Sequence, residues 1–165
     1  MTNDQPQTET LELLEWSRLC QHLSTFAATK LGARAAKHLD PFVGRSQCLE
    51  RLAQTQEVYE LELRLDRGLS FEGIEDIGDA LERAQRGGLL SGGELLEIAT
   101  TVAGARRLRR TLDAQEEVPP TLAALVAPMR TYPELEQEIH RCIDDRGRVA
   151  DRASSKLAGI RSQIK

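Results

Sequence analysis

Apolar residues recur every three or four positions through most of the chain, a spacing typical of amphipathic helices. Over residues 8–39 this spacing predicts two or three short helices, with Gly32 as a break, and Pro41 ends the stretch. The next helix is predicted from Ser46 to about Arg67 and has two apolar faces. One face holds Leu49, Leu52, Ala53, Tyr59 and Leu63, and the other holds Val58, Leu61 and Leu65. Two apolar faces predict neighbours on both sides of this helix.

The middle of the chain predicts a short helix followed by a long one. The short helix runs over about residues 76–86 and ends at Gly87 and Gly88. Ser91 and Glu94 have the spacing of a capping box, in which each side chain bonds a free backbone N–H at the start of a helix. The long helix therefore begins there and extends to about Leu112.

The last third predicts three helices and one turn. A short helix over residues 121–127 precedes a second capping box over residues 131–134, which begins a helix reaching about Cys142. Residues 143–149 place a polar turn with a glycine between β-branched residues, which predicts a small β-hairpin. Ser154 or Ser155 caps a final helix whose apolar positions continue to the end of the chain without a stop signal.

These elements predict an all-α, multi-helix bundle. The chain contains 24 leucine and 18 alanine residues against 13 valine and isoleucine residues together, which favours helix over a large β-sandwich or barrel. We expect residues 1–7 to be disordered, residues 8–150 to form a helical core domain, and residues 151–165 to begin a longer helix. Because the final pattern has no stop signal, we expect the chain to be the amino-terminal piece of a longer protein.

Charge and cysteine content add limits on the function. The 165 residues carry a net charge of −4, which marks neither a basic nucleic-acid-coating domain nor an acidic tail. No apolar run approaches the ~20 residues needed to span a bilayer, and no charged-then-apolar leader is present, so we expect a cytoplasmic protein without a membrane partner. The three cysteines lie far apart and suit reduced thiols.

The near-neutral total hides charged segments. Residues 57–82 contain nine acidic and two basic side chains, whereas residues 83–110 contain six basic and two acidic ones. Candidate nucleic-acid contacts are the arginines of the long helix and two basic residues of the last helix, because arginine binds phosphate in a bidentate fashion. These candidates are Arg106, Arg107, Arg109, Arg110, Lys156 and Arg161. Two other interpretations stay open: the basic helix packs beside the acidic one, or it is a solvated face.

No residue pattern predicts catalysis, a metal site or a nucleotide site. The three histidines lack the spacing that places two metal ligands on one helical face. The glycines at 87, 88, 92 and 93 lack the Gly-Lys-Ser/Thr of a phosphate-binding loop. The carboxylates Asp144, Asp145 and Asp151 fail the calcium-loop pattern and predict a turn. We therefore expect this chain to hold no cofactor of its own.

The order of several short motifs resembles a known family. The motifs are residues 10–16, 74–77, 81–84, 87–95 and 143–154, followed by Leu157, Ile160 and Arg161. Together they look like the amino-terminal region of the second bacterial MutS subfamily, the MutS paralogue that carries an Smr domain. Trp16 stands where this family more often has phenylalanine. The resemblance covers nearly the whole chain, and it makes residues 143–161 similar to the family's entry into its long lever helix.

The resemblance implies a core, or lever-base, module of a larger ATPase. Such a parent would use ATP and magnesium, carry an Smr endonuclease, act as a homodimer, bind branched DNA and suppress homologous recombination. In some bacteria the family also splits collided ribosomes, so ribosomal RNA is an implied partner. The ATPase and nuclease residues would lie beyond Lys165, so none transfers to this chain. The alternative is a free-standing helical adaptor that binds a protein partner.

Overall fold

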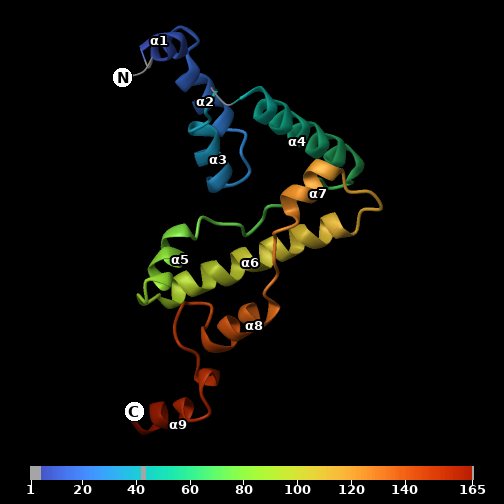
Figure 1. Ribbon diagram of the computed structural model, residues 1–165. Helices are drawn as coiled ribbons and strands as arrows, with labels where there is room; N and C mark the ends of the chain where they lie inside the picture. Colours follow the sequence, from blue (N-terminus) through green and yellow to red (C-terminus); the bar gives the residue numbers. More distant parts are fainter. Residues whose placement is uncertain (1–4, 42–43, 165) are drawn as a thin grey trace. The chain divides into compact units, whose positions relative to one another are not determined.

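The computed structural model describes residues 5–41 and 44–164 and is built of helices (Figure 1). Within those residues no β-strand is present, which confirms the prediction of an all-α fold. In chain order the elements are α1 (Gln5–Leu13), α2 (Trp16–Ser24), α3 (Lys30–Lys37), α4 (Arg45–Arg64), α5 (Gly78–Gln85), α6 (Gly92–Asp113), α7 (Pro120–Val126), α8 (Pro133–Cys142), the 3-10 helix η1 (Asp151–Ala153) and α9 (Leu157–Ile164).

The chain divides into two compact units, residues 1–48 and residues 49–165. The core domain expected over residues 8–150 therefore covers parts of both units. Helix α1 begins at Gln5, inside the segment that we expected to be disordered, and residues 1–4 of that segment lie outside the described residues.

The first unit is a small group of three helices with little buried surface. Its breaks lie at Glu15, which has a positive φ of 50°, and between α2 and α3, rather than at the predicted Gly32. Gly32 instead lies in the first turn of α3, where its N–H donates to the Thr29 hydroxyl at 3.0 Å. Cys20 and Ser24 are the buried residues described in this unit.

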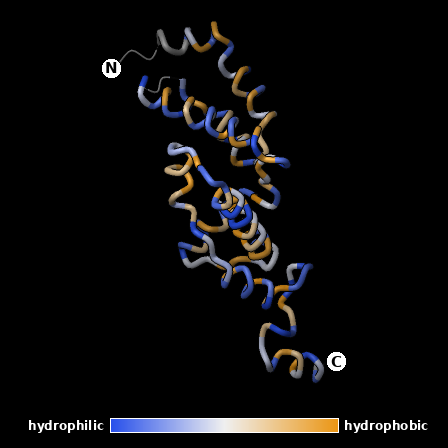
Figure 2. The backbone as a smooth tube through the Cα atoms, turned by 90° about the vertical axis from the view of Figure 1, so that its right-hand side faces the viewer, coloured by the Kyte–Doolittle hydropathy of each residue, from blue (hydrophilic) through white to orange (hydrophobic). Residues whose placement is uncertain are grey.

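The second unit is organised around α6. Near its start, Ile98 and Ala99 pack with residues of α5 and α8, including Ile139. Near its end, Leu112 packs with Leu61 of α4 and Leu122 of α7. Hydrophobic and hydrophilic positions alternate along the helices (Figure 2), as expected for surface helices that each bury one face. None of the described helices is both long enough and apolar enough to cross a membrane.

The helix starts test the two predicted capping boxes. The Ser91–Glu94 box at the start of α6 is confirmed: the Glu94 N–H donates to Ser91 Oγ, and the Ser91 N–H donates to Glu94 Oε2 at 2.7 Å. The prediction of a capping box over residues 131–134 is wrong, because Tyr132 is the N-cap of α8 and makes no side-chain cap bond. Pro133 causes this shift, since proline favours the first helical position and keeps the preceding residue out of the helical region.

The hairpin predicted over residues 143–149 is reduced to a turn closed by one antiparallel bridge, between Ile143 and Val149. The turn packs against the start of α6. A β-carbon at Gly92 would overlap the carbonyl oxygen of Gly147, and Gly147 itself has a φ of 73°. Gly92 therefore provides room for this contact, where a side chain would not fit.

Candidate functional site

The arginines of α6 point to three different segments of the second unit. Arg106 forms a bidentate pair with Glu136 of α8, with distances of 2.9 Å from Nε to Oε1 and 2.7 Å from Nη2 to Oε2. The Glu136 side chain is only 8% exposed. Hydrogen bonds from Arg106 hold the pKa of Glu136 below its usual value and raise the pKa of Arg106. This pair fixes α6 against α8.

Two further arginines of the run bond backbone carbonyls. Arg107 Nη2 donates to the carbonyl oxygen of Glu72 at 2.8 Å. Arg109 Nη1 donates to the carbonyl oxygen of Val126, at the end of α7, at 2.9 Å, and its Nε bonds Asp113. Three of the four candidate phosphate contacts on α6 are therefore engaged inside the chain, but none of these bonds is to an acidic side chain of residues 57–82.

Arg110 is exposed, as Arg107 is, but its side chain makes no hydrogen bond or ion pair among the described residues. The side chain of Lys156 is also exposed and makes no hydrogen bond or ion pair within the described part of the chain. Arg161 pairs with Asp151 and donates from Nη2 to the carbonyl oxygen of Val149 at 2.9 Å. Of the six candidates, these contacts leave Arg110 and Lys156 free to meet phosphate.

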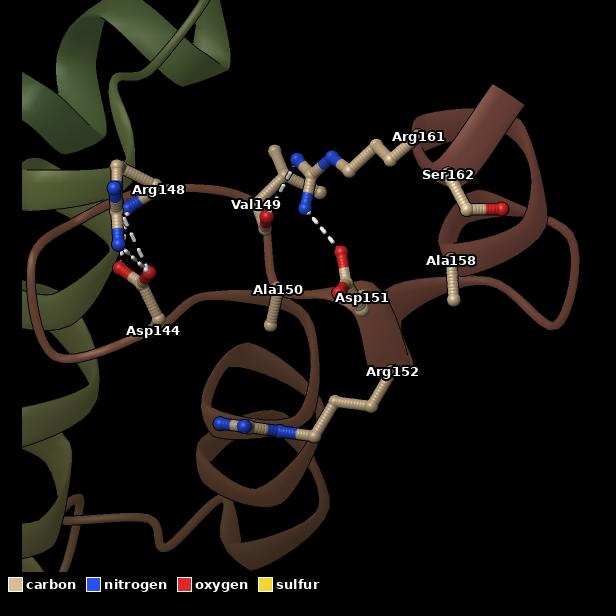
Figure 3. A pocket seen from close by; sticks show the side chains of 9 residues that line it. All are labelled: Asp144, Arg148, Val149, Ala150, Asp151, Arg152, Ala158, Arg161 and Ser162. Carbon is tan, nitrogen blue, oxygen red and sulfur yellow. Dashed lines mark hydrogen bonds and ion pairs between the residues drawn. The ribbon is translucent and has the colours of Figure 1, made fainter. Parts of the chain in front are cut away.

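Arg161 belongs to a network that we call the joint: the side-chain hydrogen bonds and ion pairs of Arg141, Asp151, Arg152 and Arg161, which connect α8 to α9. Figure 3 shows Arg161 reaching from α9 back to Val149 and Asp151, and Arg148 facing Asp144 across the turn. These residues line an open cavity of about 930 Å³. Among the lining residues, Arg148 pairs with Asp144 and Arg161 with Asp151, while Arg152 donates to the carbonyl oxygen of His140. The pair of Arg161 and Asp151 connects α9 to η1.

Helix α8 and η1 are bonded to each other from both sides. Arg141 of α8 donates to the carbonyl oxygens of Arg152 at 2.9 Å and Ala153 at 3.1 Å. Arg152 donates in return to the carbonyl oxygen of His140 at 2.7 Å. Each guanidinium thus satisfies carbonyl groups where a helix ends, which removes unsatisfied acceptors and fixes the direction of the chain.

Two carboxylates hold the arginines and the turn in place. The Arg141 guanidinium, with a bond from the Cys142 thiol, lowers the pKa of Glu138 to about 2. The backbone N–H of Arg148, followed by that of Arg146, lowers the pKa of Asp144. Glu138 therefore orients Arg141, and Asp144 closes the turn.

The sequence did not reveal the structural roles of Arg141, Arg152 and Glu138. Their available signal was the pair at positions 138 and 141, which lie three residues apart on one helical face. The carbonyl partners could not be foreseen, because they are main-chain atoms placed by the turn. The carboxylates Asp144 and Asp151 act in the turn and in an ion pair. No group of metal-ligating side chains is found within the described ranges 5–41 and 44–164.

The fold and its bonds define a helical module whose arginines act mainly in holding helices together. No family model matches the chain. The chain is 52% identical over 157 residues to the Endonuclease MutS2 of Synechocystis sp., which covers 95% of this chain and 19% of that protein. It is 36% identical over 156 residues to Endonuclease MutS2 of Symbiobacterium thermophilum (94% of this chain, 19% of the relative). It is 37% identical over 159 residues to that of Bacillus cereus (94% and 20%).

The chain is homologous to the amino-terminal part of the MutS2 proteins, which confirms the resemblance seen in the sequence. It spans about a fifth of the length of these relatives.

Proposed function

We propose that this chain is the non-catalytic helical base of a MutS2-type protein and that its joint sets the direction of α9. The observation that carries the proposal is the reciprocal bonding of Arg141 and Arg152, together with the return of Arg161 to Asp151 and Val149. In this proposal the lever helix expected over residues 151–165 starts at α9, after the 3-10 helix η1 and a turn. Packed elements transmit a displacement because they have few intermediate arrangements.

The wider activity belongs to the proposed parent protein. We propose that it is a cytoplasmic homodimer that uses ATP and magnesium, and that it cleaves nucleic acid through a domain outside these residues. Its proposed partners are branched DNA, through which it suppresses homologous recombination, and collided ribosomes with their ribosomal RNA. The module would hold no ATP or metal itself and would pass the state of the ATPase to the rest of the molecule.

The test uses the parent protein with Arg161→Ala, Arg152→Ala and, as a matched control, Arg146→Ala. Arg146 is exposed, and its side chain makes no bond within the described residues. We expect ATP hydrolysis to continue in all three variants. Nucleotide-dependent change in branched-DNA affinity should fall about tenfold only in the joint variants, because the lever is then uncoupled. Unchanged coupling in both joint variants would refute the proposed role.

The adaptor remains a second candidate, because α4 leaves apolar side chains exposed, including Leu52 at 61% and Leu63 at 70%. An exposed apolar face is typical of a protein-binding surface. The encoded length separates the two candidates. A reading frame that continues past Lys165 into a Gly-x-x-x-x-Gly-Lys-Ser/Thr motif supports the MutS2 module, and a stop codon there supports the adaptor.

A further inference from the structure

Helix α4 carries two apolar faces, and only one is used in the core of the second unit. The inner face, with Val58, Leu61 and Leu65, packs on Leu112 and Leu122. Leu61 is 0% exposed. The outer face is the one that sequence analysis also identified as apolar, and its members are largely exposed to solvent.

We call the outer face the outer row, defined by Leu49, Leu52, Gln56, Tyr59 and Leu63. Its apolar members are 56% to 70% exposed. Because a helix turns 100° per residue, these positions lie on the side of α4 opposite Leu61. Within the second unit the row is therefore uncovered by other described residues, while the inner face keeps its place in the core.

The spacing of the outer row specifies the shape of its occupant. Its members follow one another by three, four, three and four residues, which is the a and d pattern of a coiled-coil seam. Such a seam fits the apolar row of another helix. A flat sheet or an extended peptide would not match the 3.5-residue period.

The flanks of the row specify the charge of that helix. Toward the end of α4 the flanking positions are Glu60 and Glu62, while toward its start they are Ala53 and Thr55. Glu60 also accepts a hydrogen bond from Gln56 of the row at 2.7 Å. Since flanking charges set partner choice and orientation in helix pairs, the occupant requires lysine or arginine beside its own apolar row, opposite these glutamates.

The size of the row decides between two sources of such a helix. A stable interface between separate molecules uses about 20–30 residues on each partner, far more than this row offers. A helix in the same polypeptide needs less contact, because tethering gives it an effective concentration on the order of millimolar. The MutS2 relatives are about five times as long as the part that this chain matches, so they contain ample further sequence.

We propose that the outer row is covered by an amphipathic helix, flanked by basic residues, from the part of the parent polypeptide outside these 165 residues. The inference rests on the proposed function, since it requires the longer MutS2-type parent. It adds that α4 binds two parts of that parent at once, with its inner face on the module and its outer row on a distant segment.

Thiol labelling compares Leu63→Cys in the 165-residue chain and in the parent, with Arg51→Cys as the matched control. Arg51 is exposed on the same helix but lies off the row. We expect the thiol introduced at position 63 to react at least about tenfold more slowly in the parent than in the chain, at every protein concentration, because it is covered there. The control should react equally in both proteins.

A charge variant tests the predicted chemistry of the occupant. In the parent, Glu60→Lys with Glu62→Lys should restore much of the labelling at position 63, because like charges then face each other. Glu50→Lys makes the same kind of change off the row and should leave the protection intact. Restoration by Glu50→Lys as well, or no restoration by the pair, would contradict a basic occupant.

Three outcomes would overturn the proposal. Equal labelling of the Leu63→Cys thiol in chain and parent would mean that the row stays open. Protection of the 165-residue chain that grows with its concentration would identify a second copy as the occupant. Protection of that chain at all concentrations would place the occupant within these residues. None of these outcomes decides the role of the joint. That role is tested by the nucleotide-dependent change in branched-DNA affinity of the Arg161→Ala and Arg152→Ala variants.

Discussion

At the scale of single residues, the arginines of this chain act as structural cross-links. Arg106 reaches Glu136 of α8, while Arg141 and Arg152 reach main-chain carbonyls. A guanidinium suits this work because its planar fork of five donors satisfies several acceptors at once and stays charged at all ordinary pH values. Lysine at the same positions would keep the charge and lose the fork.

The first prediction concerns the Arg106–Glu136 pair. Arg106→Ala leaves the carboxylate of Glu136, which is only 8% exposed, without its partner, so the melting temperature should fall by several degrees. Arg110→Ala removes an exposed arginine from the same run and should melt like the unaltered chain. Thermal unfolding followed by circular dichroism checks both variants. Equal melting of the two variants would show that the pair does not hold α6 to α8.

The second prediction concerns acid stability. The pKa of Glu138 is lowered to about 2 from an ordinary value of 4.5 by the Arg141 bond. A carboxyl whose pKa is depressed in the folded state stabilises the fold above the unfolded pKa, and this contribution is lost as the pH falls through the folded pKa. The free energy of unfolding should therefore drop between about pH 4.5 and pH 2.

Denaturant titrations across this pH range test the assignment. Glu138→Gln should flatten part of the drop, because the substituted side chain cannot titrate. Glu134→Gln, on the same helix and without a bond within the described residues, should leave the drop as it is. A parallel pH profile for the unaltered chain and Glu138→Gln would contradict the role of this carboxylate.

At the scale of elements, close backbone contacts position the helices. The turn at Gly147 lies against the start of α6, where a β-carbon at Gly92 would overlap the Gly147 carbonyl oxygen. A β-carbon at Gly93 would have the Ser91 hydroxyl oxygen as its nearest neighbour, at 3.9 Å. Packing therefore requires glycine at position 92, whereas position 93 has room for a side chain.

The third prediction follows from these adjacent glycines. Gly92→Ala should destabilise the chain by about 1–3 kcal/mol, because the turn must move away. Gly93→Ala should be neutral or stabilise the chain by up to about 1 kcal/mol, because alanine favours helix over glycine. Chemical denaturation of both variants measures the difference. Equal effects would mean that the turn does not press on α6.

The fourth prediction compares the two faces of α4. Leu61→Ala should cost about 2–5 kcal/mol, since Leu61 is fully buried and its loss leaves a cavity. Leu63→Ala, two residues away and 70% exposed, should cost less than about 0.5 kcal/mol in the 165-residue chain. The midpoints of urea unfolding curves measure both effects. Similar costs would contradict the assignment of inner and outer faces.

Element positions could largely be predicted from periodicity and stop signals, as α6 and its Ser91–Glu94 cap illustrate. The start of α8 could not, because the preference of Pro133 for the first helical position competed with a cap at residue 131. The roles of the arginines could not be predicted either. Glu136 lies 30 residues from Arg106, and their meeting depends on how α6 and α8 pack.

Contacts made between distant segments were the least predictable. Glu57 of α4 accepts bonds from the N–H groups of Thr121 and Leu122, and so satisfies the start of α7. Sequence spacing of 65 residues gives no sign of such a contact. The same holds for the arginine run of α6. Its carbonyl and carboxylate partners come from other elements, so in the sequence alone the run has the pattern of a phosphate-binding surface.

At the scale of the whole molecule, the chain carries surfaces with different proposed uses. We propose that the joint directs α9, that the outer row of α4 receives a further helix, and that the exposed cations Arg110 and Lys156 meet phosphate. Four of the six arginines and lysines suggested by sequence serve internal bonds instead. Any electrostatic contact with nucleic acid would therefore be small.

The fifth prediction concerns that contact. The 165-residue chain should bind branched DNA weakly, and Arg110→Glu with Lys156→Glu should lower the slope of log affinity against log salt by about two. Arg130→Glu, an exposed change elsewhere in the second unit, supplies a comparison for general charge. A salt slope unaffected by the paired change would remove these two residues from the candidate site.

The most direct test of the central claim measures the direction of α9 relative to α6. Spin labels at Arg110→Cys and Gln163→Cys, with the three native cysteines replaced by alanine, report the distance between these helices. We expect one narrow distance distribution in the 165-residue chain and in Arg146→Ala. A broad distribution is expected in Arg161→Ala and Arg152→Ala, where the joint has lost its bonds. A distribution as broad in the unaltered joint as in these variants would contradict the claim that the joint fixes α9.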